Sequence, residues 1–361
     1  MNAIAGTGKA RLVVQTWVGS RLLLAAVAVW VMSHDGKSLT DVLANWDVQH
    51  FLSIARDGYA ESNSIAFFPG WPLVLRLLSW TPVGAVVGGT IIAIVCGGVA
   101  AAALYRLAGA PAAIAWLLAP TAVFTFVPYT ESLFCAAAFW AWERASAKQW
   151  PAAAVLACVA AGVRVSGLFL IGALGLLALT QAGRARERLA RVAWLVLPLL
   201  VVGAYAAFTI WKTGDPLGWY HAQEAGWARS LSTPLDCLKN TIAAAQPGAY
   251  GDHPEWSWVF RGELVSVAVG VIVTVICLVR KRVAEAAWVL VQLVAFSFSE
   301  WFMSVNRAVL LWFPLWTNIG DAVEHWPSSR VRTVILAVVV VVALAVQCVW
   351  GWLFFTGRWA S

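Results

Sequence analysis

The sequence predicts an all-α, polytopic membrane protein. Of its 361 residues, 61% are hydrophobic and only 12% are charged, and the mean hydropathy is +0.76. Soluble domains usually carry about a quarter charged residues. The first apolar run, 12–32, is too long for the h-region of a signal peptide and lacks a small-residue cleavage site, so we expect a retained span.

Apolar runs along the chain predict about 11 membrane spans. They lie at 12–32, 82–107, 111–128, 131–147, 150–163, 165–181, 189–211, 262–280, 284–300, 305–323 and 332–355. The fifth and sixth runs are short for a hydrocarbon core of about 30 Å. We therefore expect either a re-entrant pair or a corner at 164–167 that lies in a dip. The whole chain, 1–361, is predicted to form one domain.

The basic residues predict the orientation, because they concentrate in short cytoplasmic loops. With the N-terminus in the cytoplasm, 14 of the 25 Lys and Arg residues fall on the cytoplasmic side. Two long loops, 33–81 and 212–261, then lie outside the cell, with short turns near Glu131, Arg164 and Arg307. The net charge of +7 is therefore a feature of topology and not a sign of nucleic-acid binding.

The six cysteines are scattered and indicate neither a disulfide framework nor a metal motif. By contrast, the predicted extracytoplasmic connections carry most of the chemically versatile side chains. These include Asp47, His50, Glu131, Arg164, Lys212, Asp215, His221, Arg229 and Arg307. We expect an active or binding site on that face, built from several loops over a helical scaffold.

The first long loop contains Asn45-Trp46-Asp47-Val48-Gln49-His50. In a helix, Asp47 and His50 share one face, and a carboxylate in a partly dry place can take a proton from a sugar hydroxyl. The same residues could instead form a helix N-cap, with Asn45 or Asp47 accepting free amides. A metal site that combines Asp47, His50 and Glu131 is a third interpretation, although no tight ligand cluster supports it.

An aromatic turn follows, with Phe67 and Phe68 before Pro69-Gly70-Trp71-Pro72. Aromatic side chains at this position can anchor a loop at headgroup level, and they can also line a path for a lipid tail. The two roles are compatible.

Two further positions carry charge at the ends of predicted spans. Glu131 opens the fourth span, where it could be a helix cap that suits the dipole. Arg164 lies between two apolar segments, where a cation is costly unless it is paired or binds an anion. It could bind a phosphate, or it could be the structural partner of Glu131 or Asp47.

The second long loop combines Trp and Tyr with Asp, Gln, Glu and His around His221, just after Lys212. Carbohydrate sites use such combinations, and so does an interfacial aromatic belt. Arg307 lies at the outer end of the tenth predicted span, where it could also be a snorkelling interfacial cation.

Taken together, these motifs resemble the PIG-V-like mannosyltransferase family of the glycosyltransferase C superfamily. The resemblance rests on Trp46-Asp47-x-x-His50-Phe51-Leu52, Ala66-Phe67-Phe68-Pro69, Tyr129-Thr130-Glu131-Ser132-Leu133-Phe134, Arg164-x-Ser166-Gly167 and Ser304-x-x-Arg307. The segment 213–227 resembles the bacterial, actinobacterial-type branch. Gly167 departs from the family pattern, which often has Asn there.

The resemblance implies inverting transfer of mannose from a polyprenyl-phosphate-mannose donor to an extracytoplasmic glycan, glycolipid or protein, giving an α-mannoside. Asp47 would be the catalytic base. The other implied site residues are Trp46, His50, Phe67, Phe68, Glu131, Arg164, Ser166, Lys212, His221 and Arg307. No cofactor is required, and a divalent metal is possible but not expected. Nucleic acid is not an expected partner.

The Ala-rich, Trp-rich and Lys-poor composition suggests a bacterium of high genomic GC, with the protein in the plasma membrane. Its acceptor would then be a cell-envelope molecule. Two alternatives are a flippase or transporter of a lipid-linked sugar, and a non-catalytic subunit of the same fold. A transporter should show internal repeats and charged residues near the bilayer midplane, and neither is evident.

Overall fold

The computed structural model describes residues 2–227 and 229–360, and every regular element in these two ranges is helical. Five helical segments are long and apolar enough to cross a membrane: Gly8–Asp35, Ala85–Leu117, Ala185–Thr213, Pro254–Val279 and Arg330–Thr356. Shorter apolar helices span Trp150–Val163, Ser166–Thr180 and Val283–Ser297. The all-α, multi-pass membrane prediction is confirmed, and the total of about 11 spans remains a prediction.

The described residues form two compact units, and we describe each by itself. Unit 1 contains 2–49, 77–139 and 310–360, and unit 2 contains 50–76, 140–227 and 229–309. Two helices, α3 (Asp47–Asp57) and α6 (Glu131–Ser146), begin in unit 1 and continue into unit 2. The single-domain expectation stays a prediction.

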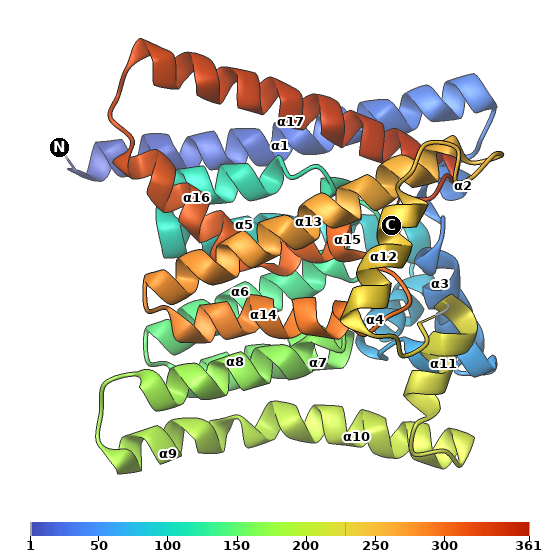
Figure 1. Cartoon of the computed structure of the whole chain (residues 1–361), viewed down its shortest axis with the longest axis horizontal. Coiled ribbons are helices and arrows are strands. Elements are labelled where there is room, and N and C mark those ends of the chain that lie inside the picture. Colours follow the sequence, from blue (N-terminus) through green and yellow to red (C-terminus); the bar gives the residue numbers. More distant parts are fainter. Residues whose placement is uncertain (1, 228, 361) are drawn as a thin grey trace. The chain divides into compact units, whose positions relative to one another are not determined.

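Unit 1 is built around α1 (Asn2–Asp35), α5 (Ala85–Leu117) and α17 (Arg330–Thr356). Helices α1 and α17 lie side by side and run in the same direction (Figure 1), since Leu24 contacts Gly351 and Lys37 Nζ donates to the Thr356 carbonyl. The smaller elements of unit 1 are α2 (Leu39–Leu43), the 3-10 helix η2 (Ala122–Thr125) and α16 (Phe313–His325).

The predicted boundary between the spans 82–107 and 111–128 coincides with a break in the helical backbone of α5 at Ala108 and Gly109. The main correction concerns the far end of the second span, which was predicted to reach 128, because the helix ends at Leu117. The chain beyond it is irregular, contains η2, and is almost entirely buried. Non-helical backbone at membrane depth is tolerated where protein covers it. The run 118–128 is therefore apolar because it lies inside the protein.

Unit 2 contains most of the remaining helices. They are η1 (Ser62–Ala66), α4 (Gly70–Ser79), α7 (Trp150–Val163), α8 (Ser166–Thr180), α9 (Ala185–Trp194), α10 (Val196–Thr213), α11 (Gly218–Trp227), α12 (Pro234–Ala244), α13 (Pro254–Val279), α14 (Val283–Ser297), α15 (Val305–Ala308) and η3 (Val309–Leu311). The last residues of α4 (77–79) and of η3 (310–311) belong to unit 1. The predicted loop 33–81 is thus largely helical, and the predicted loop 212–261 contains α11 and α12. The predicted tenth span, 305–323, is divided among α15, η3 and α16.

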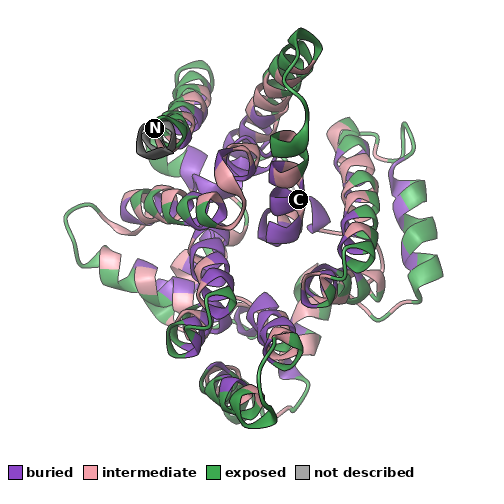
Figure 2. Cartoon of the chain, turned by 90° about the vertical axis from the view of Figure 1, so that its left-hand side faces the viewer, coloured by how far each residue is buried: buried purple, intermediate pink, exposed green. Residues whose placement is uncertain are grey.

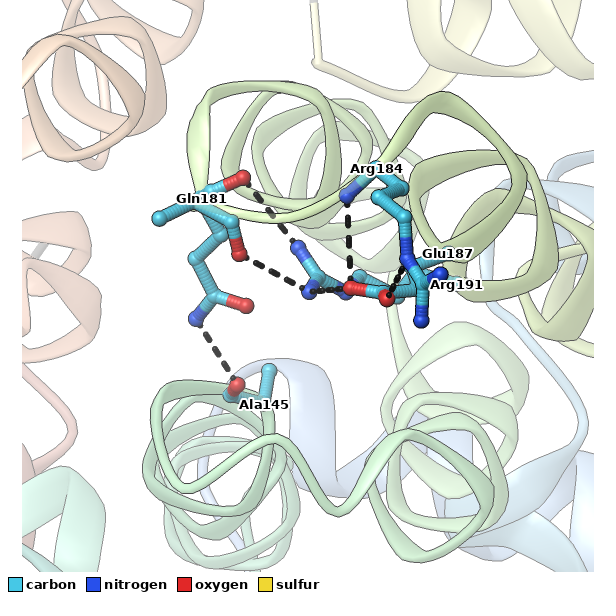
Figure 3. Close-up of polar contacts among 6 residues, drawn as sticks. Ala145, Gln181, Arg184, Glu187 and Arg191 are labelled. Atoms are coloured by element: carbon cyan, nitrogen blue, oxygen red, sulfur yellow. Dashed lines mark hydrogen bonds and ion pairs between the residues drawn. The ribbon is translucent and has the colours of Figure 1, made fainter.

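One arginine of the basic cluster between α8 and α9 has a structural role (Figure 3). The Arg191 guanidinium donates to the carbonyls of Gln181 (3.2 Å) and Ala182 (3.0 Å), and it lies 3.7 Å from the Glu187 carboxylate. Gln181 Nε2 in turn donates to the Ala145 carbonyl at 3.0 Å. A cation at the end of a helix satisfies its free carbonyls and interacts well with the helix dipole.

The helices generally have a buried stripe and an exposed stripe (Figure 2). Exposed side chains on α17 are nevertheless apolar, including Val331 (66% exposed) and Val341 (65%). Water would not favour such a surface, whereas a lipid environment does.

Candidate active site

Helix α3 begins after a strained corner. Helix α2 ends at Leu43, α3 starts at Asp47, and Trp46 between them has a φ of 56°. A left-handed backbone at a non-glycine residue costs roughly 1–2 kcal/mol. Such strain persists only where the surrounding structure fixes it, and it is concentrated at functional sites.

Side chains of the corner itself hold it in place. Trp46 Nε1 donates to the Arg358 carbonyl at 3.0 Å, and Asn45 Nδ2 donates to the Phe354 carbonyl at 3.0 Å and the Val42 carbonyl at 3.2 Å. The Asn45 amide group is therefore a donor at the end of α2, which differs from the acceptor role that the N-cap interpretation gives it. The indole nitrogen of Trp46, a site residue implied by the resemblance, is thus engaged within the protein.

Asp47 is the first residue of α3, and its side chain is half-buried. Its backbone N–H donates to the Tyr129 hydroxyl at 3.0 Å. Tyr129 is 2% exposed and packs between Phe124 and Phe354, with ring centroids 5.0 and 5.6 Å away. The buried Tyr129 hydroxyl thus fixes the backbone position of Asp47, the candidate base.

Glu131 follows Tyr129 by two residues and starts α6. Its side chain is fully buried and accepts a hydrogen bond from Thr130 Oγ1 at 3.2 Å. A buried carboxylate is costly unless it is paired or hydrogen-bonded, so complete burial is more than a simple surface cap requires. Unit 1 therefore places Trp46, Asp47 and Glu131 at the same end, linked through Tyr129.

Arg21 was not singled out from the sequence. It lies inside α1, is 6% exposed, and its Nη1 donates to the Thr125 carbonyl (2.9 Å) and hydroxyl (2.7 Å). Ser132 Oγ donates to the same Thr125 carbonyl at 3.1 Å. These bonds hold the segment that carries Tyr129 and Glu131. The signal was present, because an arginine inside an apolar span is expensive unless it has partners.

In unit 2, His50 lies three residues after Asp47 on α3 and is held by aromatic rings. Its imidazole stacks on Phe67 at 5.2 Å with an interplanar angle of 25°, and it meets Trp227 of α11 edge-on at 5.5 Å. Phe67 and Trp227 also contact each other at 5.1 Å. The rings restrict the orientation of the imidazole.

Side chains from α10 and from the connection after α3 donate to the backbone of the aromatic turn. The Tyr205 hydroxyl lies 2.6 Å from the Ile65 carbonyl and 2.8 Å from the Phe67 carbonyl, and the Tyr59 hydroxyl donates to the Phe67 carbonyl at 2.9 Å. Phe68 is buried against Tyr205, with ring centroids 4.5 Å apart.

Helix α11 completes this support. Trp219 Nε1 and Gln223 Nε2 each donate to the Ala66 carbonyl at 3.2 Å. The two predicted loops therefore meet within unit 2 through backbone carbonyls and aromatic side chains. These aromatic residues have packing and hydrogen-bonding roles that the comparison with carbohydrate sites did not anticipate.

Arg164 lies at the corner between α7 and α8, where it is half-buried, and Ser166 begins α8 and is buried. The corner is packed closely. A Cβ at Gly167 would lie 2.3 Å from Ala161 Cα, which excludes any larger residue with this backbone. A Cβ at Gly70 would lie 2.6 Å from the Gly162 carbonyl oxygen, so the aromatic turn abuts the end of α7.

Arg307 belongs to the short helix α15, which follows Ser304 with a φ of 68°. Glu263 of α13 is fully buried and accepts hydrogen bonds from the backbone amides of Ser304 (2.9 Å) and Asn306 (3.0 Å). Asn306 Nδ2 donates to the Val259 carbonyl at 3.1 Å. Glu263 was not among the predicted site residues, although a carboxylate within an apolar span is itself a signal.

His221 and Lys212 lie apart from these packed contacts. His221 Nδ1 is 2.6 Å from Asp215 Oδ2, and the imidazole is 53% exposed. The hydrogen bond from His221 and another from the Leu217 amide lower the pKa of Asp215. Lys212 is exposed at the end of α10. Within the described ranges, no group of three or more His, Cys, Asp or Glu residues is placed to hold a metal ion.

Comparison with known proteins finds a similar family within the N-terminal third of the chain. The family model described as Mannosyltransferase (PIG-V) matches residues 18–110. This range contains Arg21, the corner before α3, His50 and the aromatic turn.

Curated relatives agree with this match. The rat (Rattus norvegicus) GPI alpha-1,6-mannosyltransferase 2 is 32% identical over 157 residues, which are 38% of this chain and 32% of that protein. The Cryptococcus neoformans GPI mannosyltransferase 2 is 34% identical over 108 residues, 25% of each chain. The match thus spans about a third or less of the relatives' length. Over this part, the chain is similar to a family of mannosyltransferases.

A solved structure is similar over most of the chain. The crystal structure of ArnT from Cupriavidus metallidurans bound to undecaprenyl phosphate has a TM-score of 0.51 and 16% sequence identity. The alignment covers 93% of this chain and 76% of ArnT. At this identity the likeness shows only that the chain has a fold similar to that of ArnT.

Proposed function

We propose that this protein transfers a mannosyl residue from polyprenyl-phosphate-mannose to an extracytoplasmic glycan, glycolipid or protein, giving an α-mannoside. The observation that carries this proposal is the match of residues 18–110 to a mannosyltransferase family, because the strained corner before Asp47 falls inside it. The crystal structure of ArnT bound to undecaprenyl phosphate supports a lipid-linked donor.

In the proposed reaction, Asp47 removes the proton from the acceptor hydroxyl as its oxygen attacks C1 of the mannosyl group. The C1–O bond to phosphate breaks on the opposite face, so a β-linked donor gives an α-linked product, and the polyprenyl phosphate leaves with the bonding electrons. A positioned base typically contributes 10²–10⁴-fold to such a step.

Arg164, Arg307 and His50 are the proposed groups that neutralise the departing phosphate. Two of these are cations on tightly packed corners, and His50 is held by Phe67 and Trp227. Fixed charges in a partly dry place stabilise developing negative charge far better than mobile charges in water. The roles of Glu131, Ser166, Lys212 and His221 in substrate binding are part of the same proposal.

We also propose that no divalent metal is required, because a mannosyl phosphate is already activated and its leaving group can be stabilised by these cations. The direct test is turnover in EDTA. Activity retained after chelation supports the proposal, whereas loss that is restored by a divalent ion contradicts it.

The proposed orientation places the N-terminus in the cytoplasm and the site outside, in a bacterial plasma membrane. The basic residues of the short loops support this orientation. A cysteine at Ser62, which is exposed, should react with an impermeant reagent in intact cells, and one at the exposed Ala185 should not. The reverse pattern contradicts the orientation.

The activity itself is tested by incubating purified protein with polyprenyl-phosphate-mannose and a delipidated envelope extract. Mass analysis should find an acceptor heavier by one hexose, and a glycosidase specific for α-mannose should remove it. Product with β linkage contradicts the inverting mechanism. Absence of any transfer with several acceptor fractions contradicts the proposed function.

A further inference from the structure

The end of α17 contacts the corner that precedes Asp47. Among the residues of α17, those described as buried lie near its C-terminal end, at Gln347, Gly351, Leu353, Phe354 and Phe355. The other residues of this helix are exposed or partly exposed, and most of them are apolar. A helix that serves only to fill the bilayer does not need burial concentrated at one end, where the corner lies.

Gly357 turns the chain back toward the corner. It has a φ of 79°, and the Arg358 amide donates to the Leu353 carbonyl at 2.9 Å. This turn presents the Arg358 carbonyl to Trp46 Nε1, while the Arg358 guanidinium lies 4.9 Å from the centre of the Trp352 ring. A Cβ at residue 357 would lie 3.4 Å from Asn45 Oδ1.

Three donors from the first part of the chain end on carbonyls of this short segment. Lys37 Nζ donates to Thr356 (2.9 Å), Asn45 Nδ2 to Phe354 (3.0 Å) and Trp46 Nε1 to Arg358 (3.0 Å). Phe354 also packs against the ring of Tyr129, whose hydroxyl accepts the Asp47 amide. The segment therefore contacts both supports of Asp47.

We infer that the segment 353–358 is a positioning element for Asp47: it locks Trp46 in its left-handed conformation and thereby sets the direction in which α3 begins. Rotating the backbone of Trp46 into an ordinary region would redirect the first turn of α3 and the carboxylate on it. Trp46 and Asn45 are positioning residues in this account, and they act without touching the substrate. The inference rests on the proposed role of Asp47 as base.

The test uses Trp46→Phe, which keeps an aromatic ring and removes the Nε1–H donor. We expect kcat to fall about tenfold, with the Kd for polyprenyl-phosphate-mannose and the yield of folded protein within twofold of wild type. Trp17→Phe is the matched control, because it also removes an indole bond to a carbonyl, that of Ile94 at 3.1 Å, elsewhere in unit 1. It should leave kcat within twofold.

Gly357→Ala is the second variant, since it strains the turn without changing the donor groups of Lys37, Asn45 and Trp46. It should lower kcat in the same direction as Trp46→Phe, again with donor binding retained. Wild-type kcat in both variants would overturn the inference. A fall in kcat that is no larger than the loss of folded protein, and no larger than the fall in kcat of Trp17→Phe, would also overturn the inference.

Amide hydrogen exchange separates this inference from the proposed function. In Trp46→Phe, exchange should quicken at residues 45–49 and remain unchanged in α13 of unit 2, whatever reaction the protein catalyses. If wild-type protein transfers no mannose but this local exchange still quickens, the proposed function fails and the positioning role stands. Unchanged exchange at 45–49 would overturn the positioning role.

Discussion

Two corners of the chain share one backbone feature and differ in what satisfies their amides. Trp46 (φ 56°) and Ser304 (φ 68°) are non-glycine residues in the left-handed region, and each precedes a helix that carries a candidate site residue. At the first corner, the Asp47 amide donates to the neutral phenol of Tyr129. At the second, two amides donate to the carboxylate of Glu263.

The difference matches the charge that each corner carries. The second corner bears the cation Arg307, so a buried carboxylate nearby lowers the electrostatic energy. The first corner bears Asp47, and a carboxylate in place of Tyr129 would add a like charge in a place of low dielectric, where repulsion is strong. A neutral acceptor fixes the same backbone shape without this cost. A corner of this backbone shape can thus carry either an acidic or a basic side chain, provided that the group accepting its backbone amides has a suitable charge.

The largest stability effect is expected for Glu263→Gln. Each hydrogen bond from a backbone amide to the buried carboxylate contributes roughly 1.5–3 kcal/mol. The carboxylate has two acceptor oxygens, whereas the side-chain amide of Gln has one. We therefore expect a loss of about 3 kcal/mol in the free energy of unfolding, measured by denaturation in detergent. Glu187→Gln is the control, because the Glu187 carboxylate is 46% exposed and its removal should change stability by less than about 1 kcal/mol. Equal effects would contradict the proposed importance of the Glu263 corner.

Removing Arg307 from that corner, or Arg164 from the corner between α7 and α8, should weaken donor binding. Arg307→Gln and Arg164→Gln are each expected to raise the Kd for polyprenyl-phosphate-mannose about tenfold, which corresponds to about 1.4 kcal/mol. Arg184→Gln, on an exposed side chain, should leave the Kd unchanged. A stable Arg164→Gln protein with wild-type Kd removes Arg164 from the donor site, and a collapse of folded yield indicates a structural role instead.

The neutral corner should respond more weakly. Tyr129→Phe keeps the ring packing against Phe124 and Phe354 but removes the acceptor of the Asp47 amide, so we expect a loss of about 1 kcal/mol in stability and a measurable fall in kcat. Tyr220→Phe is matched, because its hydroxyl also accepts a backbone amide, that of Leu231, at an exposed position. If both variants lower kcat equally, the buried phenol has no special relation to Asp47.

The smallest effect is expected at the exposed pair of Asp215 and His221. The bond from His221 and that from the Leu217 amide make the pKa of Asp215 lower in the folded chain than in the unfolded chain. The pair therefore contributes stability above the unfolded value of about 3.9, and this contribution is lost as the pH falls through the folded value. The difference in Tm between wild type and Asp215→Asn should be present at pH 6 and should shrink as the pH falls below about 3.9. A difference that does not depend on pH would contradict this origin.

Much of the membrane architecture could be predicted from hydropathy, because long apolar runs need either lipid or a covering of protein. Hydropathy does not separate these two cases, and for this reason the segment 118–128 was predicted as part of a span. Its irregular backbone is covered by other parts of unit 1. The break within α5 at Ala108 and Gly109 falls at the predicted boundary between the spans 82–107 and 111–128, where Gly109 and Pro111 are typical of an interrupted helix.

The sequence predicted the candidate site residues but not the contacts that hold them in position. Asp47, His50, Arg164 and Arg307 carry visible charge next to apolar runs, so the sequence points to them directly. The roles of Tyr129 and of the Arg358 carbonyl depend on contacts between distant segments. Backbone acceptors leave no mark in a sequence, and a left-handed tryptophan cannot be recognised from its neighbours.

The central claim is that Asp47 acts as a base, and single-turnover transfer by Asp47→Asn protein loaded with donor tests it most directly. Asparagine keeps the shape of the side chain and is about as good at a helix start, but it cannot accept the proton. We predict transfer slower by about 100-fold or more with an unchanged donor Kd. Transfer at a near-wild-type rate would contradict the account.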